Sequence, residues 1–187
     1  MPHRHFLIHK PYGYLSQFAG EVKKKKLGEF HDFPGGIMAI GRLDEDSEGL
    51  LLLTTDGRMS ELVRSRKVEK EYYAQVDGRI TDEAIARLQT GVEIGIHNVR
   101  YRTSPCTAAR LEVAPDFAPR SRKIRDDRHG PTSWVSIILT EGKFRQVRKM
   151  TAAVGFPTLR LVRVRVAAIW LGDLPVGGVC EVADFGL

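Results

Sequence analysis

Apolar positions along the chain follow two patterns, one typical of β-strands and the other of α-helices. In the strand pattern, apolar residues alternate with polar ones or run continuously between turn-forming residues. Tyr72 thus shares a strand face with Ala74 and Val76, and Tyr73 lies on the opposite face. The predicted strands cover residues 5–9, 37–40, 50–53, 72–76, 134–140 and 159–169, with shorter ones between 92 and 114.

Three stretches with apolar residues three or four positions apart predict helices. The first follows a turn at residues 54–57, and the third covers residues 143–150. The second covers residues 82–90, where Thr81 can serve as N-cap and Gly91 can end the helix. Strands joined by turns, with a few helices between them, predict an α+β fold with a mixed or largely antiparallel sheet.

A polar nonapeptide, residues 41–49 with the sequence Gly-Arg-Leu-Asp-Glu-Asp-Ser-Glu-Gly, separates two of the predicted strands. Such a loop can hold a reactive side chain rigidly at the edge of a sheet. Its glycines permit backbone angles closed to other residues and let a ligand approach closely. The pattern also fits a solvated acidic hairpin. Arg42 and Asp44, two positions apart in an extended chain, share one side and favour a catalytic loop.

Length and composition are those of an ordinary globular domain, with 187 residues, 42% of them hydrophobic and 28% charged. No apolar run approaches the roughly 20 residues that a membrane-spanning helix needs, and no signal peptide is evident. The two cysteines, Cys106 and Cys180, have neither metal-ligand nor redox spacing. We therefore expect a cytoplasmic protein in which both cysteines are buried and reduced.

Positive charge is concentrated in one part of the chain. The net charge is +6, but residues 100–165 contain 15 Lys and Arg against 5 Asp and Glu, whereas the rest is slightly acidic. This part includes a long basic loop at residues 115–131 and a predicted helical stripe of Arg145, Arg148 and Lys149. Such asymmetry favours a polyanionic partner, nucleic acid first of all.

One activity can account for a carboxylate on a tight loop, a tyrosine on a strand and an arginine stripe on a helix. A buried carboxylate that faces an arginine stays ionised and can act as a nucleophile or a base. A tyrosine beside it can stack on a planar base or transfer a proton.

Four motifs resemble those of the RsuA-type RNA pseudouridine synthases, in the same order and over nearly the whole chain. Residues 41–50 resemble the catalytic motif of that family, and residues 70–72, Lys-Glu-Tyr, resemble its Lys-x-Tyr motif. Residues 141–150 are similar to its C-terminal basic motif, and residues 10–13, Lys-Pro-Tyr-Gly, to its opening strand and turn.

The resemblance implies a fold, an activity and a partner. The family fold is a mixed, mostly antiparallel sheet in two lobes with a central RNA-binding cleft, flanked by a few helices. Residues 131–134 and 155–160 further resemble the RluE branch, which acts on large-subunit (23S) ribosomal RNA. The implied reaction converts one specific uridine of that RNA to pseudouridine by base flipping and an aspartate-dependent mechanism, without cofactor or metal.

The resemblance also implies that residues 1–187 form a single catalytic domain of two lobes. Many RsuA-type enzymes carry an N-terminal RNA-binding S4 module, for which the position of Asp44 leaves no room. Substrate choice is then expected to come from the catalytic domain, with residues 120–130 as a candidate. We expect a monomer that binds ribosomal RNA and neither a membrane nor a small-molecule cofactor.

The roles of individual residues are also implied by the resemblance. Asp44 is the implied catalytic aspartate, acting on the flipped uridine at its base or at its ribose. Arg42 would take the place of the flipped nucleotide, and Tyr72 would stack on the uracil and assist proton removal at C5. Arg148 would pair with Asp44 and keep it ionised. The residues implied to contact RNA phosphates are Arg122, Lys123, Arg125, Arg128, Lys143, Arg145 and Lys149.

Two other classes of protein stay open on the residues alone. A metal-dependent nuclease could use the side-chain oxygens of the loop carboxylates, which are Asp44, Glu45, Asp46 and Glu48. It does not explain the neighbouring arginine, and chelator sensitivity would support it. A non-catalytic RNA-binding or ribosome-assembly module would need only the basic part of the chain, and it predicts full activity of an Asp44→Asn variant.

Overall fold

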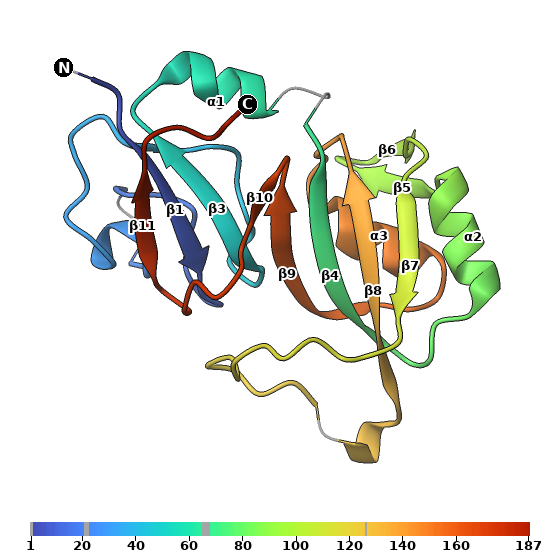
Figure 1. Cartoon of the computed structure of the whole chain (residues 1–187). Helices are drawn as coiled ribbons and strands as arrows, with labels where there is room; N and C mark the ends of the chain where they lie inside the picture. Colours follow the sequence, from blue (N-terminus) through green and yellow to red (C-terminus); the bar gives the residue numbers. More distant parts are fainter. Residues whose placement is uncertain (1, 21–22, 65–67, 126) are drawn as a thin grey trace. The chain divides into compact units, whose positions relative to one another are not determined.

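The computed structural model describes residues 2–20, 23–64, 68–125 and 127–187, and its regular structure is mostly β-strand (Figure 1). The chain forms two compact units. Unit 1 comprises Met1–Val68 and Val162–Leu187, and unit 2 comprises Glu69–Leu161. Among the described residues, no helix has both the length and the apolar character needed to cross a bilayer.

Unit 1 is built on a sheet whose central strand is the apolar stretch that follows the acidic nonapeptide. Its elements are β1 (His5–Lys10), η1 (Leu27–Glu29), β2 (Met38–Ala39), β3 (Glu48–Thr54), α1 (Gly57–Arg64), the end of β9 (Thr158–Val166), β10 (Ile169–Trp170) and β11 (Val179–Val182). The strand order is β11-β1-β3-β9. One edge of β3 pairs antiparallel with β1, and the other pairs with β2 antiparallel and with β9 in parallel.

The core of unit 1 forms around β3, which is buried along its whole length and pairs with other strands on both edges. Its continuous apolar run, residues 50–53, suits a strand that is covered on both faces. Phe6 and Ile8 of β1 are fully buried beside it. On α1, Val63 is buried as the helical pattern predicts, whereas Leu62 is 45% exposed.

Unit 2 contains a sheet, a separate hairpin and two helices. Its elements are β4 (Lys70–Asp77), α2 (Asp82–Thr90), β5 (Glu93–Ile96), β6 (Val99–Arg102), β7 (Thr107–Leu111), η2 (Asp127–His129), β8 (Thr132–Leu139), α3 (Gln146–Ala153) and the start of β9. The sheet has the order β9-β4-β8-β7, and β5 pairs with β6 in the hairpin. The predicted α+β class and the mixed, mostly antiparallel pairing are confirmed.

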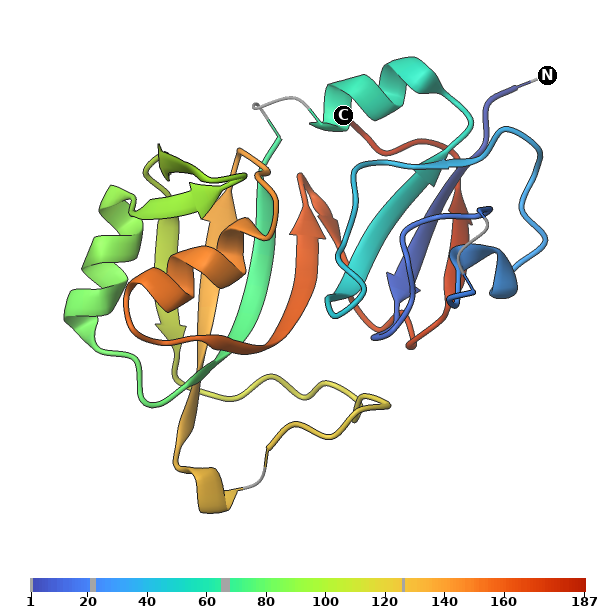
Figure 2. The ribbon, with the colours of Figure 1, turned by 180° about the vertical axis from the view of Figure 1, so that it is seen from behind.

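One face of the unit 2 sheet is covered by α2 and α3, and the apolar core lies between this face and the two helices (Figure 2). The predicted strand faces are confirmed: Ala74 and Val76 are fully buried in this core, and Tyr72 packs against it. The predicted N-cap of α2 is also confirmed, because the Thr81 hydroxyl accepts a hydrogen bond from the Ala84 amide at 3.2 Å.

The predicted helix over residues 143–150 is wrong at its beginning, because α3 starts only at Gln146. Arg145 has φ 53° and ψ 35°, the left-handed conformation that a right-handed helix excludes. Arg145 therefore precedes the helix and does not continue a helical stripe with Arg148 and Lys149. The predicted apolar face is confirmed, with Val147, Met150 and Val154 all buried.

The single strand predicted over residues 159–169 is divided in two. A turn at Ala167, with φ 52°, separates β9 from β10, which pairs back on it. The stretch after Trp170, which carries no predicted strand, contains β11 paired with β1. Cys180 on this strand is exposed and Cys106 is half-buried, so the prediction that both are buried is wrong.

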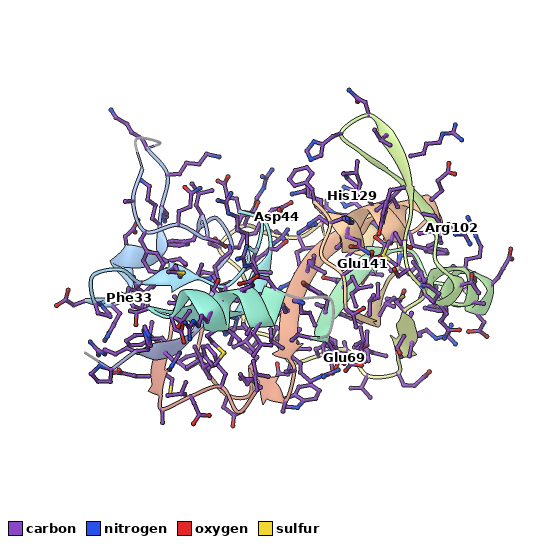
Figure 3. All side chains as sticks on the ribbon, turned by 90° about the horizontal axis from the view of Figure 1, so that it is seen from above. Phe33, Asp44, Glu69, Arg102, His129 and Glu141 are labelled. Carbon is purple, nitrogen blue, oxygen red and sulfur yellow. The ribbon has the colours of Figure 1, made fainter. Side chains whose placement is uncertain are left out.

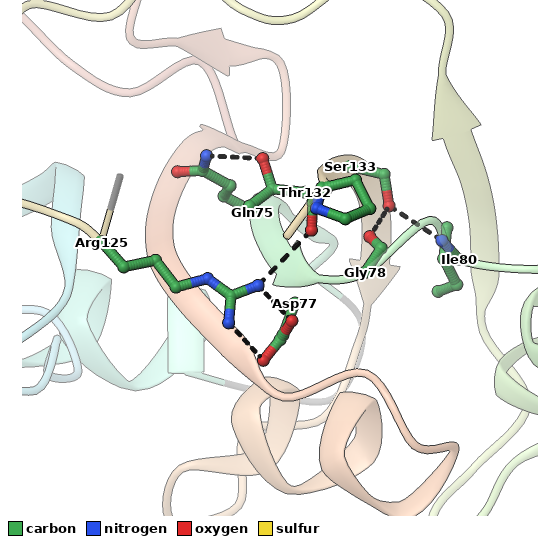
Figure 4. Close-up of polar contacts among 8 residues, drawn as sticks. Gln75, Asp77, Gly78, Ile80, Arg125, Thr132 and Ser133 are labelled. Carbon is green, nitrogen blue, oxygen red and sulfur yellow. Dashed lines mark hydrogen bonds and ion pairs between the residues drawn. The ribbon is translucent and has the colours of Figure 1, made fainter. Parts of the chain in front are cut away.

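The described part of the predicted long loop, residues 115–131, has no regular structure apart from η2, and polar contacts hold it to the rest of unit 2. The guanidinium of Arg125 binds both carboxylate oxygens of Asp77 and also donates to the Pro131 carbonyl (Figure 4). Phe117 packs against Trp134 with ring centroids 5.7 Å apart, on the sheet face opposite Tyr72. The loop is therefore anchored at its apolar beginning and at its basic end.

Candidate active site

The acidic loop, residues 41–49, is held on the N-terminal side of Asp44 by one buried hydroxyl. The Ser16 hydroxyl accepts a hydrogen bond from the Leu43 amide at 3.0 Å and donates one to the Leu43 carbonyl at 2.8 Å. Ser16 and Leu43 are both buried. Both backbone polar groups of Leu43 are thereby satisfied away from water, which fixes the peptide that enters Asp44.

A second set of contacts holds the loop on the C-terminal side of Asp44. The Glu45 carbonyl accepts hydrogen bonds from the Gly13 amide at 2.8 Å and from the Lys10 Nζ at 3.4 Å. The Glu45 side chain also meets Lys24, with Nζ and Oε2 2.5 Å apart. Asp44, which is labelled in Figure 3, is half-buried and stands between these two neighbours in the sequence. These contacts therefore fix the backbone of the loop on both sides of Asp44.

Lys10 is a fully buried ammonium at the end of β1, close to the acidic loop. Its Nζ donates to the Pro11 carbonyl at 2.9 Å as well as to Glu45. Burial lowers the pKa of Lys10 from its ordinary 10.5 to about 8, against the attraction of the loop carboxylates, which favours the charged form. Those carboxylates are Glu48, Asp46, Asp44 and Glu45, in order of their influence. Lys10 thus places positive charge near the loop without exposure to solvent.

The C-terminal end of the loop is fixed by a close approach of two backbones. Gly49 has φ 105°, and a Cβ built on it would lie 2.3 Å from the Arg163 carbonyl oxygen and 2.6 Å from the Arg163 amide nitrogen. The Arg163 Nε donates to the Leu50 carbonyl at 2.8 Å, and the whole side chain is buried. Sequence reasoning expected the loop glycines to admit a ligand, but the group that approaches Gly49 is the β9 backbone.

In unit 2, Tyr72 and Tyr73 lie on opposite faces of β4. Tyr72 packs on the apolar cluster that also contains Val147 and Met150 of α3. Tyr73 lies against Phe117 of the long loop, with ring centroids 6.3 Å apart, and burial raises the pKa of its hydroxyl. Of the two tyrosines, Tyr72 is therefore the one on the face that carries the basic helix.

The segment that leads into α3 is organised by a buried carboxylate, Glu141. It accepts hydrogen bonds from the Tyr101 hydroxyl at 2.5 Å, the Ser104 amide at 2.9 Å and the Gln146 side-chain amide at 2.6 Å. Burial alone would raise the pKa of Glu141, but these hydrogen bonds outweigh it and hold the pKa below its ordinary value. Glu141 thereby joins the β6 side of the hairpin to the start of α3 (Figure 3).

The basic residues among the predicted catalytic and RNA-contacting residues fall into three groups. Arg42 is exposed on the acidic loop of unit 1. In unit 2, four basic residues lie in or just before α3, where each is half-buried: Lys143, Arg145, Arg148 and Lys149. The long loop carries the remaining four, of which Arg122, Lys123 and Arg128 are exposed and Arg125 is half-buried against Asp77. The structure thus gathers the predicted basic residues of unit 2 on two segments.

Three residues that hold the acidic loop of unit 1 or the segment before α3 of unit 2 are missing from the sequence-based prediction of site residues. Two of them could have been found from the sequence. Lys10 is a charged residue at the end of an apolar stretch, and Glu141 is an acidic residue at the start of a basic one. Ser16 gives no such signal, because its partner Leu43 is 27 residues away. Among the described residues, no group of three or more His, Cys, Asp or Glu side chains lies close enough together to hold a metal ion.

The described fold and loop define a class of enzyme. The family model for RNA pseudouridylate synthase matches residues 4–153, and the chain belongs to this family of pseudouridine synthases. It is similar to a protein named ribosomal large subunit pseudouridine synthase E from Xanthomonas campestris pv. campestris, with 43% identity over 91% of each chain. A Vibrio parahaemolyticus protein of the same name is 39% identical over 94% of this chain and 72% of its own.

The solved structures agree on the fold. A crystal structure of a pseudouridylate synthase superposes with a TM-score of 0.77 and 24% identity, covering 97% of this chain and 71% of the other. The archaeal box H/ACA complex of Nop10 and Cbf5 gives a TM-score of 0.57 at 15% identity, covering 92% of this chain and 50% of the other. The resemblance to the RNA pseudouridine synthases and to their RluE branch is therefore confirmed.

The Ser16 contacts predict a catalytic defect without an RNA-binding defect. In Ser16→Ala, both polar groups of Leu43 lose their partner. If Asp44 is the reacting group, we expect the single-turnover rate to fall by about 10²-fold, because a shift of about 1 Å in such a group costs that much. The free energy of unfolding should fall by about 1–3 kcal/mol. Single-turnover kinetics and urea unfolding would measure both.

The matched control is Ser133→Ala in unit 2. The Ser133 hydroxyl bridges a turn in the same way, donating to the Gly78 carbonyl at 2.8 Å and accepting from the Ile80 amide at 2.9 Å (Figure 4). It should lose similar stability and keep its single-turnover rate. Equal losses of this rate in the two variants would show that Ser16 acts only through global stability.

The buried Lys10 predicts a pH-dependent stability. Between pH 8 and 10.5, Lys10 is protonated in the unfolded chain and deprotonated in the folded chain. Its contribution to the free energy of unfolding therefore increases as pH rises through this range. Relative to Lys10→Met, the wild-type free energy of unfolding should rise by about 3 kcal/mol across this range and stay level below it. Urea titrations of both proteins at a series of pH values would measure the difference, and parallel profiles would contradict it.

Proposed function

We propose that this pseudouridine synthase acts on the ribosomal RNA of the large subunit. The proposal is supported by the relatives named ribosomal large subunit pseudouridine synthase E. They match this chain over 72–91% of their own length at 39–43% identity. It is also supported by the charge of the chain, since residues 100–165 contain 15 Lys and Arg but only 5 Asp and Glu. We place this activity in the cytoplasm.

The reaction needs one bond to be exchanged for another at the same ribose. The bond between N1 of uracil and C1′ breaks, and a bond between C5 and C1′ forms. The hydrogen on C5 leaves as a proton, and N1 takes up a proton, so no oxidant, reductant or energy source is consumed. A carboxylate on a loop whose backbone is fixed can serve as the nucleophile or base for these steps.

The observation that carries the proposal is the clamping of Asp44 from both sides, at Leu43 by Ser16 and at Glu45 by Gly13 and Lys10. We assign Asp44 as the catalytic carboxylate, acting on the flipped uridine at its base or at its ribose. A fixed backbone on both sides of a catalytic group limits how far that group can move from the geometry in which it reacts.

The other roles complete the proposal. Tyr72 stacks on the uracil and assists removal of the C5 proton, and Arg148 keeps the Asp44 carboxylate ionised. Arg42 replaces the flipped base within the RNA. The basic residues of the α3 segment and of the long loop contact phosphates: Lys143, Arg145, Lys149, Arg122, Lys123, Arg125 and Arg128.

Release of tritium from RNA labelled at C5 of uridine tests this function, since any route to pseudouridine expels that hydrogen. We expect release from large-subunit RNA and not from small-subunit RNA of the same bacterium. Release from neither RNA, despite tight binding, would favour a non-catalytic assembly role. Release from the small-subunit RNA alone would leave the activity and overturn the substrate.

We further propose that residues 1–187 act as one catalytic domain, as a monomer, and without metal or cofactor. Activity should persist in a chelator after gel filtration, in the fractions of monomer mass. Loss of activity with the chelator, restored by a divalent cation, would contradict this part of the proposal.

A further inference from the structure

A tight turn at the tip of the β5–β6 hairpin presents a histidine to solvent. Ile96 pairs with Val99, which leaves only His97 and Asn98 in the turn. Both have positive φ, 47° and 64°, as a two-residue hairpin turn of this hand requires. Glycine and asparagine are the usual residues in such a turn, because they adopt positive φ most readily. Here the first position is a histidine, which places an imidazole ring at the tip of the hairpin. The His97 side chain is exposed.

A second exposed ring lies beside this histidine. Phe144, in the segment just before α3, is 56% exposed. Its ring is stacked with that of His97, with centroids 5.9 Å apart and an angle of 20° between the planes. The two rings come from elements 47 residues apart in sequence, and neither is in the core cluster of unit 2. An aromatic pair of this kind contributes little to the core but offers flat apolar faces to a ligand.

Two lysines already lie over aromatic rings in this region. The Lys149 Nζ is 5.0 Å from the centroid of Phe144, and the Lys143 Nζ is 4.8 Å from that of Tyr101. An ammonium over an exposed ring is held only weakly, whereas a stacked nucleobase is held more firmly. A base that displaces Lys149 from the ring would leave this ammonium beside the phosphates that flank the base.

Glu141 connects the two elements that carry these rings. It binds Tyr101 and Ser104 on the hairpin side and Gln146 at the start of α3, through three hydrogen bonds of 2.9 Å or less. Gln146 in turn accepts a hydrogen bond from the Lys143 amide at 2.9 Å. The relative position of His97 and Phe144 is therefore set by buried contacts before any ligand binds, and a preorganised surface loses less entropy on binding.

We propose that His97 and Phe144 form a stacking platform for an unpaired base of the RNA, with Lys143 and Lys149 on the adjoining phosphates. The proposal rests on the proposed action on RNA and adds to it a contact outside the catalytic residues. Aromatic rings with interleaved lysines suit single-stranded RNA, because unstacked bases offer faces that a duplex hides. The platform binds any base, since every base has such a face.

Binding of a fluorescein-labelled 12-nucleotide oligouridine, measured by anisotropy at several salt concentrations, tests the platform. Phe144→Leu keeps an apolar side chain and removes the aromatic face, and we expect affinity to fall about tenfold with an unchanged salt dependence. Lys149→Gln should instead reduce the slope of log K against log salt by about 0.7, the loss of one phosphate contact to a single strand. Phe144→Tyr should restore wild-type affinity.

The matched control is Trp170→Leu, which removes another exposed aromatic ring, 54% accessible, with Arg165 5.4 Å above it. It should bind oligouridine as the wild type does. Wild-type affinity of Phe144→Leu would overturn the platform, and so would a reduced salt slope in that variant, which would assign its effect to the lysine. Failure of the proposed function is distinct, because wild-type protein would then release no tritium from ribosomal RNA whatever its affinity for oligouridine.

Discussion

Asp44→Asn is expected to abolish tritium release from C5-labelled RNA while leaving RNA affinity intact. The substitution keeps the size of the side chain and removes its charge and its basicity. Loss of the group that acts as nucleophile or base should lower the single-turnover rate by at least about 10³-fold. Affinity should change by less than about threefold, because phosphate contacts supply most of the binding free energy.

The loop supplies a matched control for this variant. Asp46→Asn makes the same chemical change two positions away, at another half-buried carboxylate of the same loop. If Asp44 is the catalytic group, Asp46→Asn should retain at least about a tenth of the wild-type rate, the level expected when only a nearby charge is lost. Similar rates for the two variants would show that the loop acts through its total charge. Full activity of Asp44→Asn would remove this residue from the mechanism.

Gly49→Ala is expected to lower the free energy of unfolding more than Gly41→Ala, the other glycine-to-alanine substitution in the acidic loop. The new Cβ would lie 2.3 Å and 2.6 Å from two backbone atoms of Arg163, and φ is 105°. Backbone atoms of a paired strand cannot move aside as a side chain can, so β3 and β9 must separate where they pair. We expect a loss of about 3 kcal/mol or more in the free energy of unfolding.

Urea unfolding would show this loss as a midpoint lower by at least about 1 M. The control is Gly41→Ala at the other end of the loop. Gly41 also has positive φ, 69°, but a Cβ there would have no atom within 4 Å. It should lose only about 1–2 kcal/mol, the cost of a left-handed backbone. Equal losses in the two variants would mean that backbone conformation, and not the contact with Arg163, restricts position 49.

Several features of this protein followed from the sequence alone because their physical cause is local. Alternation along residues 72–76 is enough to separate Tyr72 from Tyr73, since successive side chains of a strand point to opposite faces. The continuous apolar run after the acidic loop predicted the buried β3, and the Thr81 hydroxyl predicted the start of α2. Motif order and spacing were enough to identify the family, which the comparisons confirm.

Other features were decided only by tertiary structure, because they depend on residues far apart in the chain. The Ser16 hydroxyl meets Leu43 across 27 residues, and Arg163 meets Leu50 across 113. The left-handed Arg145 delays α3 beyond the point where the helical pattern begins, next to a network in which Glu141 takes hydrogen bonds from a separate hairpin. The sequence by itself therefore determined which residues could react. The folded chain determined what holds them, since a buried polar group must find its partner wherever the fold provides one.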